Sequence, residues 1–118
     1  DVTMQFKFPK NDEKYSWTNH VGRKMLYYGL SPDRVKRVIR SPYRSEKGIA
    51  PDTIAVMQPS SAKAPAGKAW KEEIWVMYAN RGKKKIIITA WRYPGVSPIR
   101  EAIPIPADIL EELKSIKY

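Results

Sequence analysis

The sequence contains no cysteine, a single histidine and only two phenylalanines among its 118 residues. The lack of cysteine excludes disulfide bridges, thiol nucleophiles and thiolate metal sites. No run approaches 18 apolar residues, so no segment is predicted to span a bilayer. A signal-peptide pattern is also missing, and together these absences lead us to expect a cytoplasmic protein that has no membrane partner.

Several catalytic and cofactor motifs are missing as well. The chain has no glycine-rich phosphate loop, no nucleophile elbow and no dinucleotide fingerprint. Glu72 and Glu73 are neighbours in a predicted strand, so they should point to opposite faces and cannot act as a carboxylate pair. The only Glu-x-Lys sequence, at 112–114, falls in a predicted helix rather than on a strand beside Asp52. We therefore expect neither a metal nor a cofactor.

Positive charge is the strongest compositional signal that is present. Lys and Arg number 22 against 12 acidic residues, which gives a formal net charge of +10. This balance favours an anionic partner, first a nucleic acid and then an acidic protein. Hydrophobic residues make up 42% of the chain and aromatics 11%, so the charge is carried by a folded domain rather than a disordered polyelectrolyte.

Three helices are predicted from the spacing of apolar residues, at 18–28, 32–40 and 106–117. Thr18 or Asn19 can cap the first helix, and Gly29 can end it in a left-handed conformation. Ser31 followed by Pro32 marks the start of the second helix. The first two helices should bury Val21, Met25, Val35, Val38 and Ile39. The third should dock through Ile109, Leu110, Leu113 and Ile116.

Period-two patterns rich in β-branched and aromatic residues predict three strands, at 53–58, 70–79 and 84–93. Residues 80–83 have turn chemistry, so the last two strands should pair as an antiparallel hairpin. Residues 45–50 can add a short fourth strand, and residues 1–16 can hold a short edge strand or an ordered arm. Residues 59–69 are expected to form a mobile surface loop, and the prolines of 94–105 should keep that segment extended.

These elements predict an α+β fold in which two N-terminal helices pack on a three- to four-stranded antiparallel sheet, with a further C-terminal helix. The length supports one domain, which we expect to cover 1–118. Its core should lie at 17–93, followed by the proline-rich segment and the last helix.

A helix beginning with histidine is followed by Lys-Met, by Gly-Leu-Ser, by a second amphipathic helix and by a meander ending in an isoleucine-rich strand. The residues that carry this order are His20, Lys24, Met25, Gly29-Leu30-Ser31, Val35, Val38, Ile39 and Ile86-Ile87-Ile88-Thr89-Ala90 before Trp91-Arg92-Tyr93. The order resembles a small family of uncharacterised prokaryotic domains that is distantly similar to the RelE, ParE and BrnT type of toxin. Several of those toxins cut messenger RNA without a metal. The resemblance implies a toxin-type domain that acts on RNA rather than DNA, with an acidic antitoxin-like protein as a further partner.

Metal-free RNA cleavage needs a base, an acid and cations that stabilise the phosphorane. The candidate catalytic residues are His20, Arg23, Lys24, Tyr27, Arg92 and Tyr93. His20 can act as the base or the acid, because an unperturbed imidazole titrates near neutral pH. The three cations can hold the phosphate, and either tyrosine can donate a proton or stack on a base. The alternative is that His20 is an ordinary structural or capping residue beside a solvated basic face.

The segment 23–47 contains eight cations against two acids, which predicts a surface for polyanions. The candidate nucleic-acid-binding residues are Arg34, Lys36, Arg37, Arg40, Arg44 and Lys47. A solvated helix surface is the alternative interpretation of this cluster. The cations of the hairpin tip at 81–85 can form a second contact, but exposed turns commonly carry lysine, so we interpret them as turn residues. The strand aromatics, including Trp70, can stack on bases, but we interpret them as core. Two hypotheses result, a metal-independent ribonuclease and a non-catalytic module that binds nucleic acid or an acidic protein.

Overall fold

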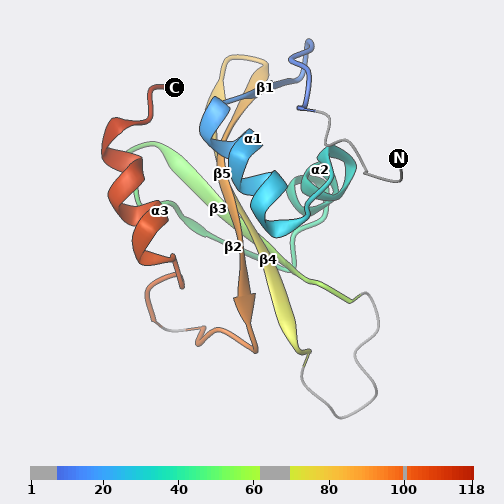
Figure 1. Cartoon of the computed structure of the whole chain (residues 1–118), viewed down its shortest axis with the longest axis vertical. Coiled ribbons are helices and arrows are strands. Elements are labelled where there is room, and N and C mark those ends of the chain that lie inside the picture. The colour runs from blue at the N-terminus through green and yellow to red at the C-terminus, as the bar shows by residue number, and fades with distance from the viewer. Residues whose placement is uncertain (1–7, 62–69, 100) are drawn as a thin grey trace, which may run out of the picture.

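The computed structural model describes residues 8–61, 70–99 and 101–118, which form one sheet with helices on both of its faces (Figure 1). The strands are β1 (Tyr15–Trp17), β2 (Arg44–Lys47), β3 (Thr53–Pro59), β4 (Glu72–Arg81) and β5 (Lys84–Pro94). The helices are α1 (Asn19–Tyr28), α2 (Pro32–Arg40) and α3 (Ala107–Glu112), and a 3₁₀ turn follows α3 at Leu113–Ser115. The predicted α+β class is confirmed. The predicted arm at 1–16 and loop at 59–69 fall partly outside the described residues.

The sheet differs from the prediction in strand number and direction. It has five strands in the order β1-β5-β4-β3-β2, and β1 runs parallel to β5 while the other neighbours are antiparallel. The predicted hairpin is confirmed, with Arg81 opposite Lys84 and a positive φ of 62° at Gly82 in the turn. The parallel pairing was missed because β1 is only three residues long, and its alignment is set by a strand about 70 positions later.

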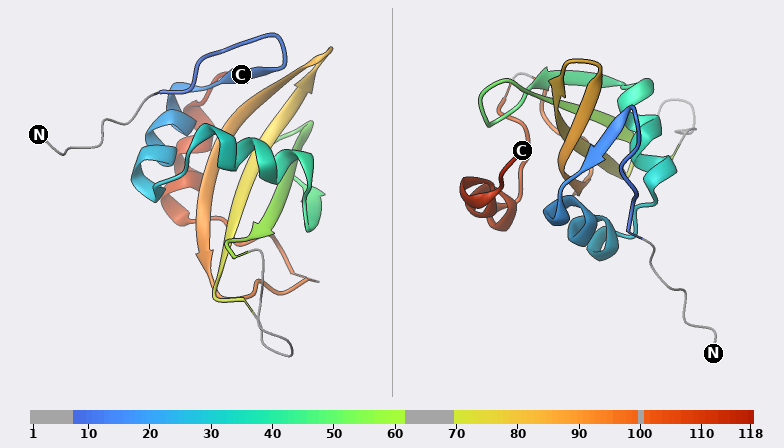
Figure 2. Two further views of the ribbon diagram at one scale, coloured as in Figure 1. Left: turned by 90° about the vertical axis from the view of Figure 1, so that its right-hand side faces the viewer. Right: turned by 90° about the horizontal axis from the view of Figure 1, so that it is seen from above.

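The first core lies between α1, α2 and one face of the sheet. It contains all five predicted helix side chains, namely Val21, Met25, Val35, Val38 and Ile39. Val56, Ile74, Val76, Ile87 and Ala90 are among the strand residues that meet them. Figure 2 shows α2 lying across the strands in its left panel. The amphipathic pattern of the two helices therefore predicted their packing correctly.

The opposite face of the sheet is covered by α3 and the segment that precedes it. Ile109 is fully buried there, and Leu113 and Ile116 pack against the same cluster around Trp75 and Trp91. Leu110, which was predicted to share this face, is 44% exposed. The prediction for Leu110 is wrong: it follows Ile109 directly, about 100° further round the helix, and only Ile109 faces the core. The α-helix is also six residues long rather than twelve, and a 3₁₀ turn follows it.

The ends of α1 follow the predicted capping chemistry. The Thr18 Oγ1 atom accepts a hydrogen bond from the Val21 amide at 3.0 Å and donates one to the Ile88 carbonyl at 2.8 Å. Gly29 ends the helix with a φ of 67°, and the Leu30 amide donates to the Met25 carbonyl at 2.8 Å. Thr18 therefore fixes the start of α1 against β5.

The pairing of β4 with β5 contains one irregularity. Met77 lies opposite Thr89 and Tyr78 lies opposite Ile87, so one extra residue is accommodated on β5. Such a bulge changes the direction of neighbouring side chains. Seen from above in Figure 2, α1 lies beside the sheet between α2 and α3. Thr89 lies beside this bulge, and its hydroxyl is 2.9 Å from the Nε2 atom of His20 on α1. Within the described residues, no helix is long and apolar enough to cross a bilayer.

Candidate functional site

His20 is buried where α1, β5 and α3 meet, and its side chain is only 4% exposed. Its Nε2 atom lies 2.9 Å from the Thr89 hydroxyl, and its Nδ1 atom lies 3.7 Å from a Glu112 carboxylate oxygen. The order carboxylate, imidazole and hydroxyl is the order found in hydrolase triads. Thr89, however, has no exposed surface, so a substrate cannot reach its hydroxyl. The three side chains therefore join the elements together rather than form a nucleophilic site.

The surroundings of His20 favour the neutral imidazole. Burial lowers its pKa from the ordinary value of 6.5, and the positive charges of Lys24 and Arg23 lower it further. Glu112 and Asp108 act in the opposite direction without reversing the shift. At neutral pH the weak contact with Glu112 is thus a contact with an uncharged ring.

Lys24 links α1 to α3 instead of facing open solvent. Its Nζ atom lies 3.0 Å from Asp108 and 2.9 Å from Glu112. Burial by itself would lower the pKa of Lys24, but the hydrogen bonds to Glu112 and Asp108 outweigh it and raise the pKa. With both acids already bound to Lys24, its charge is largely neutralised by the protein itself.

Arg23 and Tyr27, the other candidates on α1, are exposed. Arg23 lines an open pocket of about 430 Å³ together with His20, Glu112 and Lys117. Tyr27 is 77% exposed and meets the Tyr28 ring edge-on at a centroid distance of 4.8 Å. The four candidates on α1 therefore comprise one buried, one ion-paired and two exposed side chains.

The structure does not bring Arg92 to His20. The Arg92 guanidinium donates to the Tyr28 carbonyl at 2.6 Å and to Glu72 at 2.8 Å, which places it at the C-terminal end of α1. His20 is in the first turn of the same helix, about 12 Å away along the axis. Tyr93 is half-buried against the second core. The predicted catalytic set is thus divided between the two ends of α1.

The solvent side of α2 carries a group of four cations. Arg37 and Arg40 are exposed, and Arg34 and Lys36 are half-buried. Within the described residues, none of the four lies within ion-pair distance of a carboxylate. Burial lowers the pKa of Arg34, and the nearby positive charges of Arg37 and Arg92 lower it further. Lys36 lies 5.3 Å from the centre of the Tyr15 ring, and its charge adds to the backbone hydrogen bonds in lowering the pKa of Asp12. The surface is therefore locally positive, most clearly at the three arginines.

Arg44 and Lys47 do not extend this surface as predicted. Arg44 is buried, lies 2.6 Å from Glu46, donates to Ser97 at 2.8 Å and stacks over the Trp75 ring. Lys47 is exposed at the far end of β2. The prediction for Arg44 is corrected, because a sequence shows a cation but not the acid and the aromatic ring that bury it.

Three residues near α2 were not predicted as site residues. Tyr43, Gln58 and Trp70 line an open pocket of about 510 Å³ together with Arg34 and Arg37. Trp70 was interpreted as core, and it does pack partly against the second core while also lining this pocket. A tryptophan directly after a polar low-complexity segment was the available sequence signal.

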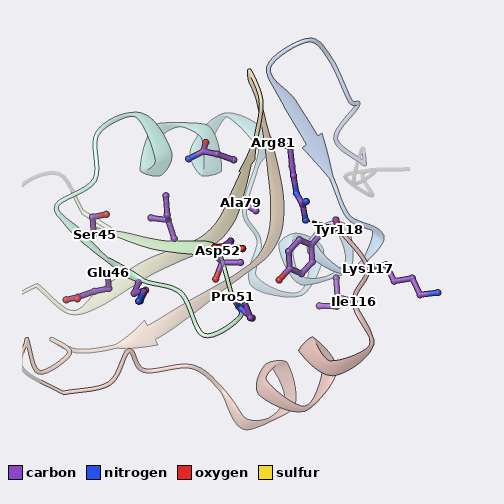
Figure 3. Close-up of a pocket in the computed structure, with 13 residues that line it drawn as sticks. Ser45, Glu46, Pro51, Asp52, Ala79, Arg81, Ile116, Lys117 and Tyr118 are labelled. Atoms are coloured by element: carbon purple, nitrogen blue, oxygen red, sulfur yellow. Dashed lines mark hydrogen bonds between the residues drawn. The ribbon is translucent and has the colours of Figure 1, made fainter.

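A third and larger pocket, of about 1030 Å³, lies between β2, the start of β3 and the last residues of the chain (Figure 3). Its charges are mixed, since Glu46 and Asp52 face the same space as Arg81 and Lys117. Arg81 stacks over the Tyr118 ring at 5.7 Å and donates to the Tyr118 carbonyl. This pocket therefore has no single sign of charge that would select an anion.

Neither a metal site nor a similarity to known proteins gives a further indication of function. In the described part of the chain, no group of three histidine, cysteine or acidic side chains is placed to hold a metal ion. No protein-family model, curated protein or solved structure is found to match the chain. The resemblance to RelE-type toxins accordingly stays a prediction, and function has to be argued from the site itself.

Proposed function

We propose that this protein is a non-catalytic module that binds nucleic acid through the solvent side of α2. One observation carries the proposal: within the described residues no cation of α2 forms an ion pair with a carboxylate, whereas Lys24, Arg44 and Arg92 each do. A cation that is already neutralised gains little from a phosphate. A group of unpaired cations attracts phosphates and releases their counterions.

The cations on this face are Arg34, Lys36, Arg37 and Arg40, and we name the group the α2 basic face. Three of them are arginines, whose planar guanidinium groups can contact a phosphate through two parallel hydrogen bonds. The only acid in α2 is Asp33, which lies in the first turn, where its negative charge interacts favourably with the positive end of the helix dipole. The α2 basic face is therefore suited to a chain of phosphates.

Binding of a labelled single-stranded RNA, followed by fluorescence anisotropy, tests this function. If about four to six phosphates are neutralised, raising the salt from about 50 to 200 mM should reduce affinity roughly 50- to 300-fold. Replacing Arg37 and Arg40 together by Gln should weaken binding and flatten the salt dependence. Lys83→Gln combined with Lys84→Gln is the control with the same loss of charge, because both cations lie at the β4–β5 turn and outside α2.

Two results would contradict the proposal. One is an affinity that does not change with salt, and the other is an equal loss of binding in the control at Lys83 and Lys84 and in the α2 variant. Polyglutamate added as a competitor separates an acidic-protein ligand from nucleic acid. Displacement of the RNA by polyglutamate at equal charge concentration would favour the acidic protein.

A metal-independent ribonuclease is the second candidate function. The observation in its favour is that His20 lines an open pocket with Arg23, Glu112 and Lys117. The burial of His20 and the distance to Arg92 weigh against it. Cleavage of RNA in EDTA that His20→Gln abolishes without unfolding the protein would favour the ribonuclease over the binding module.

A further inference from the structure

The pocket beside α2 combines positive charge with aromatic rings. Its volume of about 510 Å³ is within the range of small-ligand pockets, roughly 300–1,000 Å³. Two arginines, Arg34 and Arg37, line it from α2, and two aromatic residues, Tyr43 and Trp70, line it from the connections around the sheet. Cationic and aromatic side chains thus face one space.

Arg34 is held in place at this pocket by the end of β3. Its Nη1 atom donates to the Gln58 side-chain oxygen at 2.6 Å, and its Nη2 atom donates to the Pro59 carbonyl at 3.1 Å. Gln58 is itself fixed, because its amide donates to the Ser41 carbonyl at 2.6 Å. Within the described residues these are two hydrogen bonds from a group with five hydrogens, so the guanidinium keeps donor capacity for a ligand oxygen.

The two aromatic residues of the pocket, Tyr43 and Trp70, form what we call the aromatic wall, and contacts within the protein fix its orientation. The Tyr43 and Trp70 rings meet edge-on, with their centroids 4.8 Å apart and their planes at 75°. The Trp70 indole donates to the buried carboxylate of Glu73 at 3.0 Å, which fixes the ring. Tyr43 is 63% exposed, so its face is open to solvent. An exposed ring of this kind is a stacking surface for a base.

We propose that this pocket binds one nucleotide unit of a single strand, with its phosphate at Arg34 and Arg37 and its base against Tyr43 and Trp70. The inference rests on the nucleic-acid binding proposed above and names its substrate class. A single strand can turn an unpaired base toward the aromatic wall, whereas the bases of a duplex are already stacked on each other. Single strands should therefore bind more tightly than duplexes of the same length.

Intrinsic fluorescence offers a direct readout at this site. Of the four tryptophans, Trp17, Trp75 and Trp91 are buried, and only Trp70 is partly exposed. Stacking of a base on Trp70 should quench its emission when oligouridine or oligoadenine is added, and Trp70→Phe should lose the quench. A duplex of equal length at the same salt should quench much less.

Tyr43 provides a matched pair of variants, because its exposure makes both tolerable to the fold. Tyr43→Leu should weaken binding of the single strand about 5- to 150-fold, the usual effect of losing one stacked aromatic, while Tyr43→Phe should bind nearly as the wild type does. Circular dichroism of each variant checks that the fold is intact.

The possible failures can be told apart. Equal binding of single strand and duplex, with no effect of Tyr43→Leu, overturns the nucleotide pocket and leaves the α2 basic face as a general polyanion surface. No binding of any nucleic acid by the wild type at low salt overturns the pocket and the proposed function together.

Discussion

At the scale of single residues, His20 shows what a helical pattern can predict and what it cannot. The spacing of apolar residues correctly placed His20 beside Val21 and Met25 on α1. Its burial depends on Thr89 and Glu112, which lie 69 and 92 positions away in the chain. No local pattern contains that information, so the sequence left both a catalytic and a structural interpretation of His20 open.

The lowered pKa of His20 predicts a particular dependence of stability on pH. The folded protein resists protonation of this imidazole, whereas the unfolded chain takes up a proton near the ordinary pKa of 6.5. As the pH falls through that value, the unfolded state is stabilised and the free energy of unfolding decreases. Urea unfolding measured at pH 8, 7, 6 and 5 should therefore show stability falling toward acid from about pH 7.

His20→Gln is the control for this effect, because His20 is the only histidine in the chain. The variant should lose the pH dependence between 7 and 5. Two carboxyl groups also have a lowered pKa: a hydrogen bond from Tyr15 lowers that of Asp12, and one from Lys24 lowers that of Asp108. Because both values lie below the ordinary 3.8, these groups do not produce the change between pH 7 and 5. An unchanged pH dependence in His20→Gln would contradict the interpretation of His20 as a buried neutral base.

At the scale of elements, local chemistry predicted the helices and the long strands. The caps at Thr18 and Ser31, the turn glycines and the two-residue periodicity all correspond to observed elements. The errors occur where an element is short. β1 has three residues and α3 has six, and such elements are stabilised by tertiary packing rather than by their own propensity. Their bounds could therefore not be obtained from the sequence alone.

The docking of α3 should depend on a single apolar side chain. Ile109 is fully buried in the second core, while its neighbour Leu110 is 44% exposed. Ile109→Ala should reduce the free energy of unfolding by about 2–5 kcal/mol, because it removes buried methyl groups and leaves a cavity. Leu110→Ala should change it by only about 0.5 kcal/mol. Chemical denaturation of both variants measures the difference, and equal losses would contradict the observed register of α3.

At the scale of the whole molecule, the sequence predicted the sign of the charge better than its distribution. The net charge of +10 correctly indicates an excess of cations. The fold places those cations in different surroundings: Lys24 pairs with acids of α3, Arg92 binds the end of α1, and Arg44 is buried. The α2 basic face forms no ion pair within the described residues. Acidic partners chosen by the tertiary fold decide which cations remain for a ligand. The candidate catalytic set was dispersed for the same reason.

The central claim is that nucleic acid contacts α2 and the adjoining pocket. A titration of the labelled protein with a short single-stranded RNA, followed by two-dimensional amide and indole NMR at about 50 mM salt, tests it most directly. The account predicts shift changes concentrated in α2, at Tyr43 and Gln58, and at the Trp70 indole. Changes centred on His20 and the residues around Glu112, or no changes at all, would contradict it.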